Sequence, residues 1–352
     1  MEKDWLGLPF RPISEMYRSI FHRKVYKIPV TMVDTCPNRM GLKGMRTCIF
    51  CDQWGSAADA SSQGQALLEQ IKKHRERLQR KMKAEAFLVY FQAYTNTFTK
   101  ISSLRANLEL AISQSQSQST ESSNIVGVVI GTRPDCISPA VLNLWQEFAS
   151  RTKVFIELGV QSFSDSDLQF YQRGHTHQQT MKAIDAIAKL HQVDLGIHLI
   201  FGAPGETLTQ AQDSAKICNQ LPVSNVKLHN LHVLKGTELE LLHAQGKFQA
   251  IEFEEYCEKV QAFLEELSPA TYVHRLAAYA PRWDELIAPA WTADKMKSHQ
   301  GIVDWLRSKQ SYQSRRFNAN LPHLQSLQTE LQSRATPKSI SEKPSRPFTL
   351  GI

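Results

Sequence analysis

Short apolar runs alternate along the chain with longer segments in which apolar residues recur every three or four positions. Runs rich in β-branched and aromatic residues are typical of buried strands, and the longer periodic segments are typical of helices. Six runs fit strands, at 24–33, 86–92, 125–131, 154–160, 194–202 and 225–233. Five segments between them fit helices, at 65–83, 104–112, 140–148, 179–190 and 208–221.

This alternation predicts an α/β fold of parallel strands joined by crossover helices. Six units favour a partial (β/α)6 barrel of the TIM type or an open doubly wound sheet, and both place a site at the carboxyl ends of the strands. We expect two later helices, 253–267 and 302–309, to flank the barrel. The predicted parts are an N-terminal extension (1–23), a core (24–280), a C-terminal helical extension (281–320) and a disordered basic tail (321–352).

The charge of the chain is uneven. Its net charge is +7 over 352 residues, and the segment 305–352 holds eight basic and two acidic residues, a net charge of +6. A second basic run, KKHRERLQRKMK, spans 72–83. Like-charged segments are usually solvated, and contact with a polyanion such as RNA is the alternative interpretation.

The sequence favours a cytoplasmic protein without a membrane segment. Acidic Glu2 and Asp4 stand where a signal peptide would carry basic residues, and no apolar run approaches the length of a membrane span. Thiols stay reduced in the cytosol, so clustered cysteines there indicate metal or redox chemistry before disulfides.

Three of the six cysteines lie close together after the first predicted strand. Their spacing is Cys36-x11-Cys48-x2-Cys51, and the nearest candidate for a fourth ligand, His74, belongs to a separate predicted helix. A structural zinc site wants four ligands, so three thiolates indicate a centre with one open position. The residues favour an iron–sulfur site, with zinc or chance as alternatives. The other three cysteines are scattered, as buried small hydrophobes are.

The loop resembles the signature of the radical S-adenosylmethionine (SAM) superfamily, which ends in Cys-x-aromatic-Cys, here Cys48-Ile49-Phe50-Cys51. The gap of eleven residues replaces the usual three and is shared with the branch that includes the Elongator catalytic subunit. Further blocks between 24 and 291 resemble, in order, those of the YhcC-like radical SAM proteins: KVYKIPV, TCPNR, YFQAYTNTF, GTRPDC, ELGVQS, RGH, HLIFGAPGET, KLHNLHVLKGT and HRLAAYAPR.

The resemblance implies a [4Fe–4S] cluster held by Cys36, Cys48 and Cys51, with S-adenosyl-L-methionine on the open iron. It implies that an electron from a partner such as flavodoxin or ferredoxin cleaves SAM to a 5′-deoxyadenosyl radical, which abstracts hydrogen from a substrate. Gln161 and Arg173 are similar to SAM-binding residues of oxygen-independent coproporphyrinogen oxidase. The residues expected to bind the cofactor are Phe50, Tyr94, Asn96, Arg133, Gln161, Arg173 and Gly202.

Several of these residues have simpler interpretations. Phe50 could be a core aromatic, Asn96 a turn cap, and Arg133 could pair with Asp135. The histidines in or near strands are more often structural than catalytic; they are His198, His229, His232 and His274. Lys227 shares one face of the sixth strand with His229, and both become candidate substrate contacts if that face points inward.

Three functions follow from the resemblance and the charge. The first is a radical SAM enzyme of tRNA or RNA modification, which would bind RNA through 72–83 and 305–352. The second is a radical SAM enzyme acting on a small metabolite, and the third is a non-catalytic protein that binds the cluster and SAM.

Overall fold

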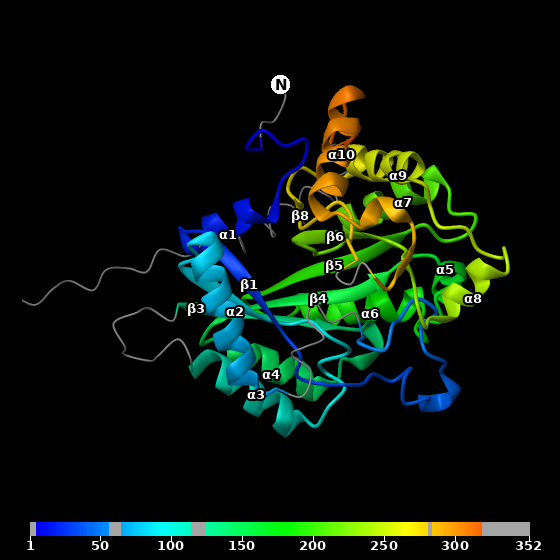
Figure 1. The fold of residues 1–352 in the computed structure, drawn as a ribbon. Helices are drawn as coiled ribbons and strands as arrows, with labels where there is room; N and C mark the ends of the chain where they lie inside the picture. The colour runs from blue at the N-terminus through cyan, green and yellow to red at the C-terminus, as the bar shows by residue number, and fades with distance from the viewer. Residues whose placement is uncertain (1–4, 56–64, 114–123, 281–283, 319–352) are drawn as a thin grey trace, which may run out of the picture.

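The chain forms one curled sheet of seven parallel strands with helices packed around its outside (Figure 1). The structure is a computed structural model and describes residues 5–55, 65–113, 124–280 and 284–318. The strand order is β1-β2-β3-β4-β5-β6-β8, with β1 and β8 at the two edges. These strands are β1 (Val25–Val30), β2 (Ala86–Phe91), β3 (Ile125–Thr132), β4 (Lys153–Gln161), β5 (Val193–Phe201), β6 (Asn225–Asn230) and β8 (Tyr272–Val273).

The six predicted strands are confirmed, and two of them are clearly shorter than predicted. The run 24–33 forms β1 over Val25–Val30 only. The run 225–233 ends as β6 at Asn230, and Val233–Leu234 forms β7, which pairs antiparallel with β9 (Leu286–Ala288). The seventh strand of the main sheet, β8, has only two residues, which are too few to produce a periodic pattern.

The predicted helices are also present. The helices between strands are α2, α3, α4, α6 and α7, and the two later ones are α9 and α10. Helix α10 begins at Lys295 rather than at 302, because the Asp294 side chain accepts hydrogen bonds from two amides of its first turn. In full, the α-helices are α1 (Ile13–Phe21), α2 (Leu67–Met82), α3 (Ile101–Ser113), α4 (Pro139–Ala149), α5 (Asp165–Phe170), α6 (His177–Ala188), α7 (Leu208–Gln220), α8 (Glu238–Ala244), α9 (Phe253–Glu266) and α10 (Lys295–Ser308).

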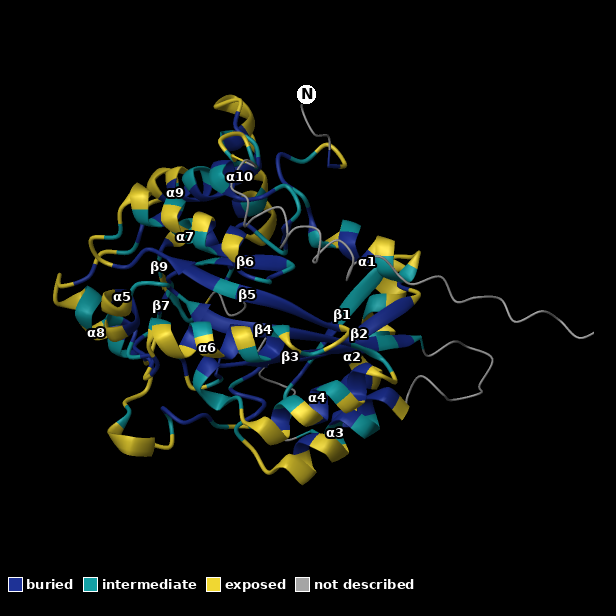
Figure 2. Ribbon diagram, turned by 180° about the vertical axis from the view of Figure 1, so that it is seen from behind, coloured by how far each residue is buried: buried dark blue, intermediate teal, exposed yellow. Residues whose placement is uncertain are grey.

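The main hydrophobic core lies between the outer face of the sheet and the helices. It includes Phe87 and Phe91 from β2, Trp145 and Phe148 from α4, and Phe263 from α9. Figure 2 shows strands that are almost entirely buried beneath helices with exposed outer faces. Strands covered in this way read as continuous apolar runs, which is why they were visible in the sequence. The fold is therefore the predicted α/β partial barrel, and not a flat doubly wound sheet.

Helix α1 closes the end of the half-barrel where the strands begin. Its Met16 and Tyr17 pack against inward-facing Leu88, Val129 and Phe155. The rings of Tyr17 and Phe155 meet edge to face with centroids 5.7 Å apart. Because this end is filled with apolar side chains, the space inside the half-barrel opens toward the carboxyl ends of the strands.

Part of the predicted organisation lies outside the described residues. This holds for the tail 321–352, and hence for most of the basic segment 305–352. The division of the chain into extension, core and tail remains a prediction. Among the helices of the described residues, none combines the length and apolar character that crossing a bilayer requires.

Candidate functional site

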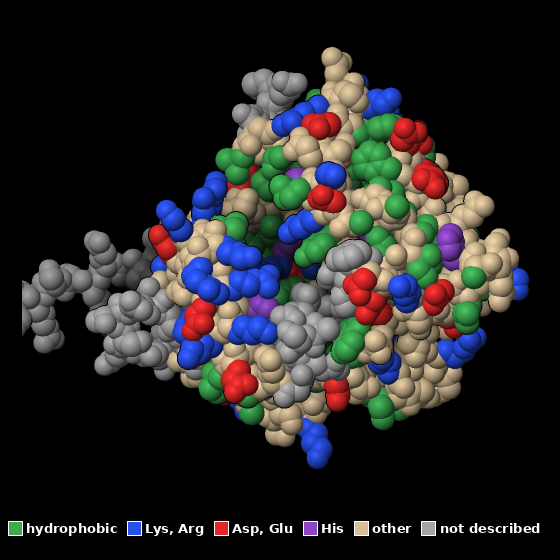
Figure 3. All heavy atoms as spheres, viewed as in Figure 1, with side chains coloured by type: hydrophobic (Ala, Val, Ile, Leu, Met, Phe, Trp, Pro, Cys, Tyr) green, Lys and Arg blue, Asp and Glu red, His purple; other side chains and the backbone are tan. Residues whose placement is uncertain are grey.

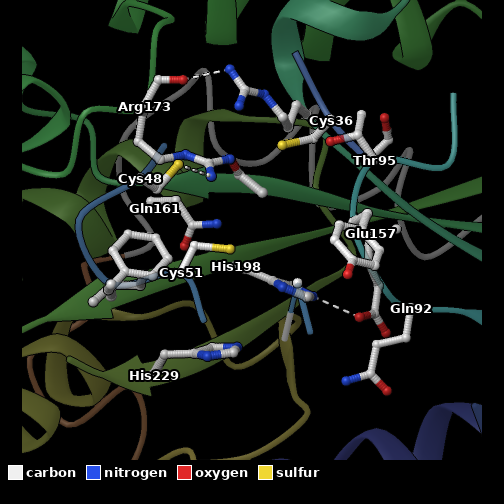
Figure 4. A pocket seen from close by; sticks show the side chains of 18 of the residues that line it. Cys36, Cys48, Cys51, Gln92, Thr95, Glu157, Gln161, Arg173, His198 and His229 are labelled. Atoms are coloured by element: carbon white, nitrogen blue, oxygen red, sulfur yellow. Dashed lines mark hydrogen bonds and ion pairs between the residues drawn. The ribbon is translucent and has the colours of Figure 1, made fainter. Parts of the chain in front are cut away.

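A cavity at the carboxyl ends of the strands brings the three clustered cysteines together. Cys36, Cys48 and Cys51 all line it. Figure 4 shows their sulfur atoms pointing into the same space, with Gln161 and Arg173 beside them. Further lining side chains come from the ends of the second to sixth strands, so the loop after β1 forms a roof over the opening of the half-barrel.

The cysteine loop is anchored to the rest of the protein by buried hydrogen bonds. Asn38 is buried, and its side-chain amide donates to the carbonyls of Arg46 and Gln172, each at 2.6 Å. The Ile49 amide donates to the Tyr171 carbonyl at 3.3 Å. These bonds join both halves of the loop to the segment after α5, which also carries Arg173.

Two guanidinium groups lie against the sulfur atoms. Arg173 Nη1 is 3.4 Å from Cys48 Sγ, and Arg39 Nη2 is 3.7 Å from Cys51 Sγ. Cations at this distance stabilise thiolates. Burial, with Cys48 nearby, raises the pKa of the Cys51 thiol to about 12, so a metal must displace the proton when it binds.

These residues fit an iron–sulfur cluster better than a single metal ion. In the described part of the chain, no group of three or more His, Cys, Asp or Glu side chains is arranged to hold one ion. Three thiols around a shared cavity, with cations facing two of them, suit a larger and negatively charged group. The zinc alternative loses its support, because a zinc site needs its ligands around one atom.

The end of β4 places one face of the strand in the cavity. Glu157, Gly159 and Gln161 all line it, as their spacing of two predicted. Gln161 has a φ of +71°, a strained conformation that turns its side chain at the strand end. A Cβ at Gly159 would lie 2.9 Å from Gln161 Nε2 and 3.4 Å from Arg173 Nη2, so glycine leaves room for both groups.

Two aromatic residues form part of the cavity wall. The Phe50 ring lines the cavity and packs edge to face on Tyr171, with centroids 5.7 Å apart. Both interpretations of Phe50 therefore apply, since it is a core aromatic and also faces the site. Tyr94 has a φ of +57°, and its ring lies over Gly55, where a Cβ would come within 2.3 Å of it. Only glycine fits at position 55, because any side chain there would overlap with the Tyr94 ring.

For three of the expected cofactor contacts, the structure shows partners within the protein or a place outside the cavity. Arg133 lines the cavity, but its guanidinium forms two 2.9 Å bonds to Asp135, which is the simpler of its two interpretations. Asn96 does not line the cavity, because its side-chain amide is fully buried and donates to the carbonyls of Phe91 and Gly131. It acts as a structural cap at the strand ends.

Gly202 also lies outside this cavity. It lines a separate pocket near α9, where a Cβ would come within 3.2 Å of Ile251. Its amide donates to Glu206 at 2.7 Å, and Thr207 caps helix α7. The glycine-containing turn therefore shapes the start of α7 and is not part of the cysteine site.

A buried charged cluster forms the floor of the cavity. Glu157 accepts hydrogen bonds from Lys27, from Lys227 at 2.9 Å and from the Tyr90 hydroxyl at 2.6 Å. His198 Nε2 lies 2.6 Å from the same carboxylate. Burial alone would raise the pKa of Glu157, but Lys227 and Lys27 hold it well below its usual range. Burial in turn lowers the pKa of Lys227 to about 7.

The histidines divide into cavity residues and others. His198 and His229 line the cavity, and their rings stack with centroids 5.3 Å apart. Burial lowers the pKa of His198 to about 4 and that of His229 well below its usual range, so both are neutral at pH 7. The face that His229 shares with Lys227 points inward, which was the condition for either to contact a substrate.

Sequence reasoning missed Lys27 and Tyr90. A signal was present in the first strand, where a lysine stands in the middle of the apolar run KVYKIPV. A lysine in a buried strand needs a partner, but the sequence does not say which acid supplies it. That partner, Glu157, lies 130 positions further along the chain.

Two family models and several known proteins match the sequence of this chain. A model of the radical SAM superfamily matches residues 30–218, and a model of the radical SAM C-terminal domain matches 223–308. Protein YhcC of Escherichia coli K12 is 33% identical over 279 residues, covering 78% of this chain and 85% of YhcC. A tRNA uridine(34) acetyltransferase of Methanocaldococcus jannaschii is 29% identical over 136 residues, covering 38% of this chain and 24% of that protein.

A similar solved structure is archaeal Elp3 of Methanocaldococcus infernus with an N-terminal deletion. It aligns with a TM-score of 0.63 at 18% identity, over 82% of this chain and 64% of the Elp3 chain. At this identity the likeness concerns the fold alone. The chain spans less than two thirds of the Elp3 structure.

Proposed function

The chain belongs to the radical SAM superfamily, and we propose that it is an enzyme that abstracts hydrogen from a substrate held inside the half-barrel. Proteins of this superfamily bind a [4Fe–4S] cluster and SAM. When bound, these groups supply a 5′-deoxyadenosyl radical, for which flavodoxin or ferredoxin would provide the electron. Cys36, Cys48 and Cys51 would hold the cluster.

The observation that carries this proposal is the convergence of the three cysteines with Gln161 and Arg173 in one cavity. The thiols offer three ligands, which leaves one position of a four-iron cluster for SAM. The Gln161 amide can both donate and accept hydrogen bonds, as binding a ribose requires. Arg173 lies between the Cys48 sulfur and the Gly159 carbonyl, where its charge would help to hold both the cluster and SAM.

The remaining cavity residues would position the substrate and keep water out. The Phe50 and Tyr94 rings form part of the cavity wall. Helix α1 closes the opposite end with packed apolar side chains. A reactive organic radical needs such an enclosure, because solvent and buffer molecules also carry hydrogen atoms that it can take.

The test is anaerobic reconstitution of the full chain with iron and sulfide, reduction with dithionite, and chromatography for 5′-deoxyadenosine. We expect cluster absorption and SAM cleavage in the parent protein, and loss of both in Cys36→Ala, Cys48→Ala and Cys51→Ala. Cys136→Ala is the matched control, because this thiol does not line the cavity. Burial raises its pKa to about 12, and the nearby Cys36 contributes to that rise. Iron loss in the control, or intact SAM in the reduced parent protein, would contradict the proposal.

RNA is the substrate class that the surface favours. Helix α2 and its C-cap carry six exposed cations, Lys72, Lys73, Arg77, Arg80, Lys81 and Lys83, against exposed Glu69 and Glu76. Figure 3 shows Lys and Arg side chains gathered over this part of the molecule, next to a central hollow. The partial similarity to a tRNA uridine(34) acetyltransferase supports the same substrate class.

This second proposal is tested by the salt dependence of tRNA binding. Each cation that contacts a phosphate adds roughly 0.7 to 0.9 to the slope of log affinity against log salt. We expect Lys72→Gln with Arg80→Gln to lower the slope by about 1 to 2. The matched control is Lys182→Gln with Lys189→Gln, two exposed lysines of the α6 region. An equal loss in both double variants, or a slope near zero in the parent protein, argues against RNA.

A further inference from the structure

The middle of the half-barrel holds a layer of charged and polar side chains where barrels of this type usually carry apolar ones. Nearly every strand contributes to this layer: Lys27 from β1, Tyr90 from β2, Glu157 from β4, His198 from β5, Lys227 from β6 and His274 after β8. Burying charges is costly, and packed apolar residues would stabilise the interior at least as well. Polar interiors of this kind indicate binding rather than stability.

This layer contains more positive than negative charge. Glu157 is the acid that the lysines share, and its side chain is 2% exposed. Lys27 and Lys227 form ion pairs with it, and Arg275 lies near enough for its pKa to respond to Glu157 without pairing with it. These four groups sum to a formal charge of +2. The Lys227 side chain retains 10% exposure and that of Lys27 18%. Neither lysine lines the cysteine cavity itself, but their shared partners Tyr90 and Glu157 do. One oxyanion entering the hollow would bring the cluster close to neutrality.

Arg275 is the cation with unused binding capacity. Its Nη2 lies 2.9 Å from both ring nitrogens of His229, a side chain that lines the cavity. Its Nε is buried and has no hydrogen-bond partner, and no described carboxylate forms an ion pair with it. A buried guanidinium without an acid is unusual, because its planar donors match a carboxylate or a phosphate.

The charged layer is separate from the end of the cavity assigned to SAM. Glu157 precedes Gln161 by four residues on β4, which corresponds to roughly 13 Å along a strand. The cysteines and Arg173 lie at the Gln161 end (Figure 4), and α1 closes the other end. A molecule bound at the charged layer would therefore extend toward the cysteine site without occupying the cofactor's place.

We propose that Lys227 and Arg275 form a binding site for the carboxylate or phosphate group of the substrate, deep in the half-barrel. That the bound molecule is the substrate rests on the proposed function. The oxyanion site itself does not depend on it. Binding itself is measurable without turnover, so failure of one proposal does not imply failure of the other.

Anion binding at this site is coupled to protonation. Burial lowers the pKa of Lys227 to about 7. The groups that face it are Glu157, Tyr90, Lys27, Arg275, His198, His229 and His274. An anion beside Lys227 favours its charged form and raises this pKa. Affinity for an oxyanion therefore falls as the pH rises from 7 to 9, by up to about tenfold per unit for one proton.

The experiment is calorimetric titration of the reconstituted full chain, with SAM present, using inorganic phosphate and succinate as separate probes at pH 7 and pH 9. We expect at least one probe to bind at pH 7 and to weaken at pH 9. Arg275→Gln and Lys227→Met should each lower its affinity at least tenfold, while Lys216→Gln, an exposed lysine of α7, should not change it. Binding of phosphate alone or of succinate alone identifies which oxyanion the substrate carries.

Two outcomes overturn the proposal: neither probe binds, or both variants bind like the parent protein. Lys227→Met risks misfolding because it removes a partner of Glu157. Arg275→Gln keeps the test decisive, since Arg275 forms no ion pair with Glu157, and iron content reports whether each variant is folded. The formation of 5′-deoxyadenosine, measured in parallel, reports on the proposed function alone.

Discussion

Replacing Glu157 by Gln tests the charged interior most directly. The carboxylate is fully buried and accepts from two lysines and a tyrosine hydroxyl. Glutamine is nearly isosteric, but it has no charge and presents an amide donor toward groups that are themselves donors. The substitution therefore leaves two buried ammonium groups without their acid. It creates no cavity, so the loss of folding stability reports on electrostatics rather than on packing.

The size of the effect follows from burial. Removing one partner of a buried ion pair typically costs about 3–5 kcal/mol, because the other charge stays desolvated. A domain of this kind is stable by only about 5–15 kcal/mol, so Glu157→Gln should destabilise the protein severely. In Glu157→Gln with Lys227→Met, one cation leaves together with the acid. We expect this double variant to be more stable than Glu157→Gln alone.

The assay is urea unfolding of the full chain under anaerobic conditions, followed by circular dichroism. Glu147→Gln is the control, since Glu147 forms an ion pair with Arg105 in which both side chains are more than 40% exposed. Solvent screens such pairs, so the control should change stability far less. A loss below about 1 kcal/mol in Glu157→Gln, or strict additivity in the double variant, would show that the buried charges are solvated or independent.

Three further predictions follow from the geometry. Gly159→Ala places a methyl group against Gln161, and we expect SAM binding to weaken at least tenfold in equilibrium dialysis while iron content stays unchanged. Gly55→Ala displaces the Tyr94 ring, so it should lower the yield of 5′-deoxyadenosine more than it lowers iron content. Lys227 has a pKa near 7 in the folded protein against about 10.4 when unfolded. Between pH 7 and pH 10 the unfolded chain therefore binds one proton more than the folded protein. The free energy of unfolding should rise over this range by at most about 1.4 kcal/mol per pH unit. Lys227→Met should remove this rise.

The fold was readable from the sequence because its strands are buried on both faces. Such strands appear as continuous apolar runs, and the helices between them keep a clear period. The sequence analysis did not predict the helices α1, α5 and α8. The strands that escaped detection, β8 and β9, are too short for a pattern. The change of direction at Asn230 was missed for the same reason, since the run continues through Leu231 and His232 without a turn residue.

Residues of the site could be predicted where they lie close together in the sequence. The cysteine loop and the alternation of Glu157, Gly159 and Gln161 each lie within a few residues, and the cavity contains them all. Asn96 and Gly202 do not line this cavity. Position at a strand end does not say whether the Asn96 side chain enters the cavity or caps the backbone, nor which pocket the backbone of Gly202 faces.

The charged layer was the part that no local pattern could predict, and it bears most on the substrate. Lys27, Glu157 and Lys227 are separated by 130 and 70 positions, and only the closing of the half-barrel brings them together. A buried lysine in the first strand destabilises the fold unless its acidic partner comes to lie beside it. Because the same closure also brings the cysteines over this layer, formation of the barrel core assembles both the cofactor end and the anion end of one cavity. A substrate that spans them must therefore present an acidic group at one end and a hydrogen-bearing carbon at the other.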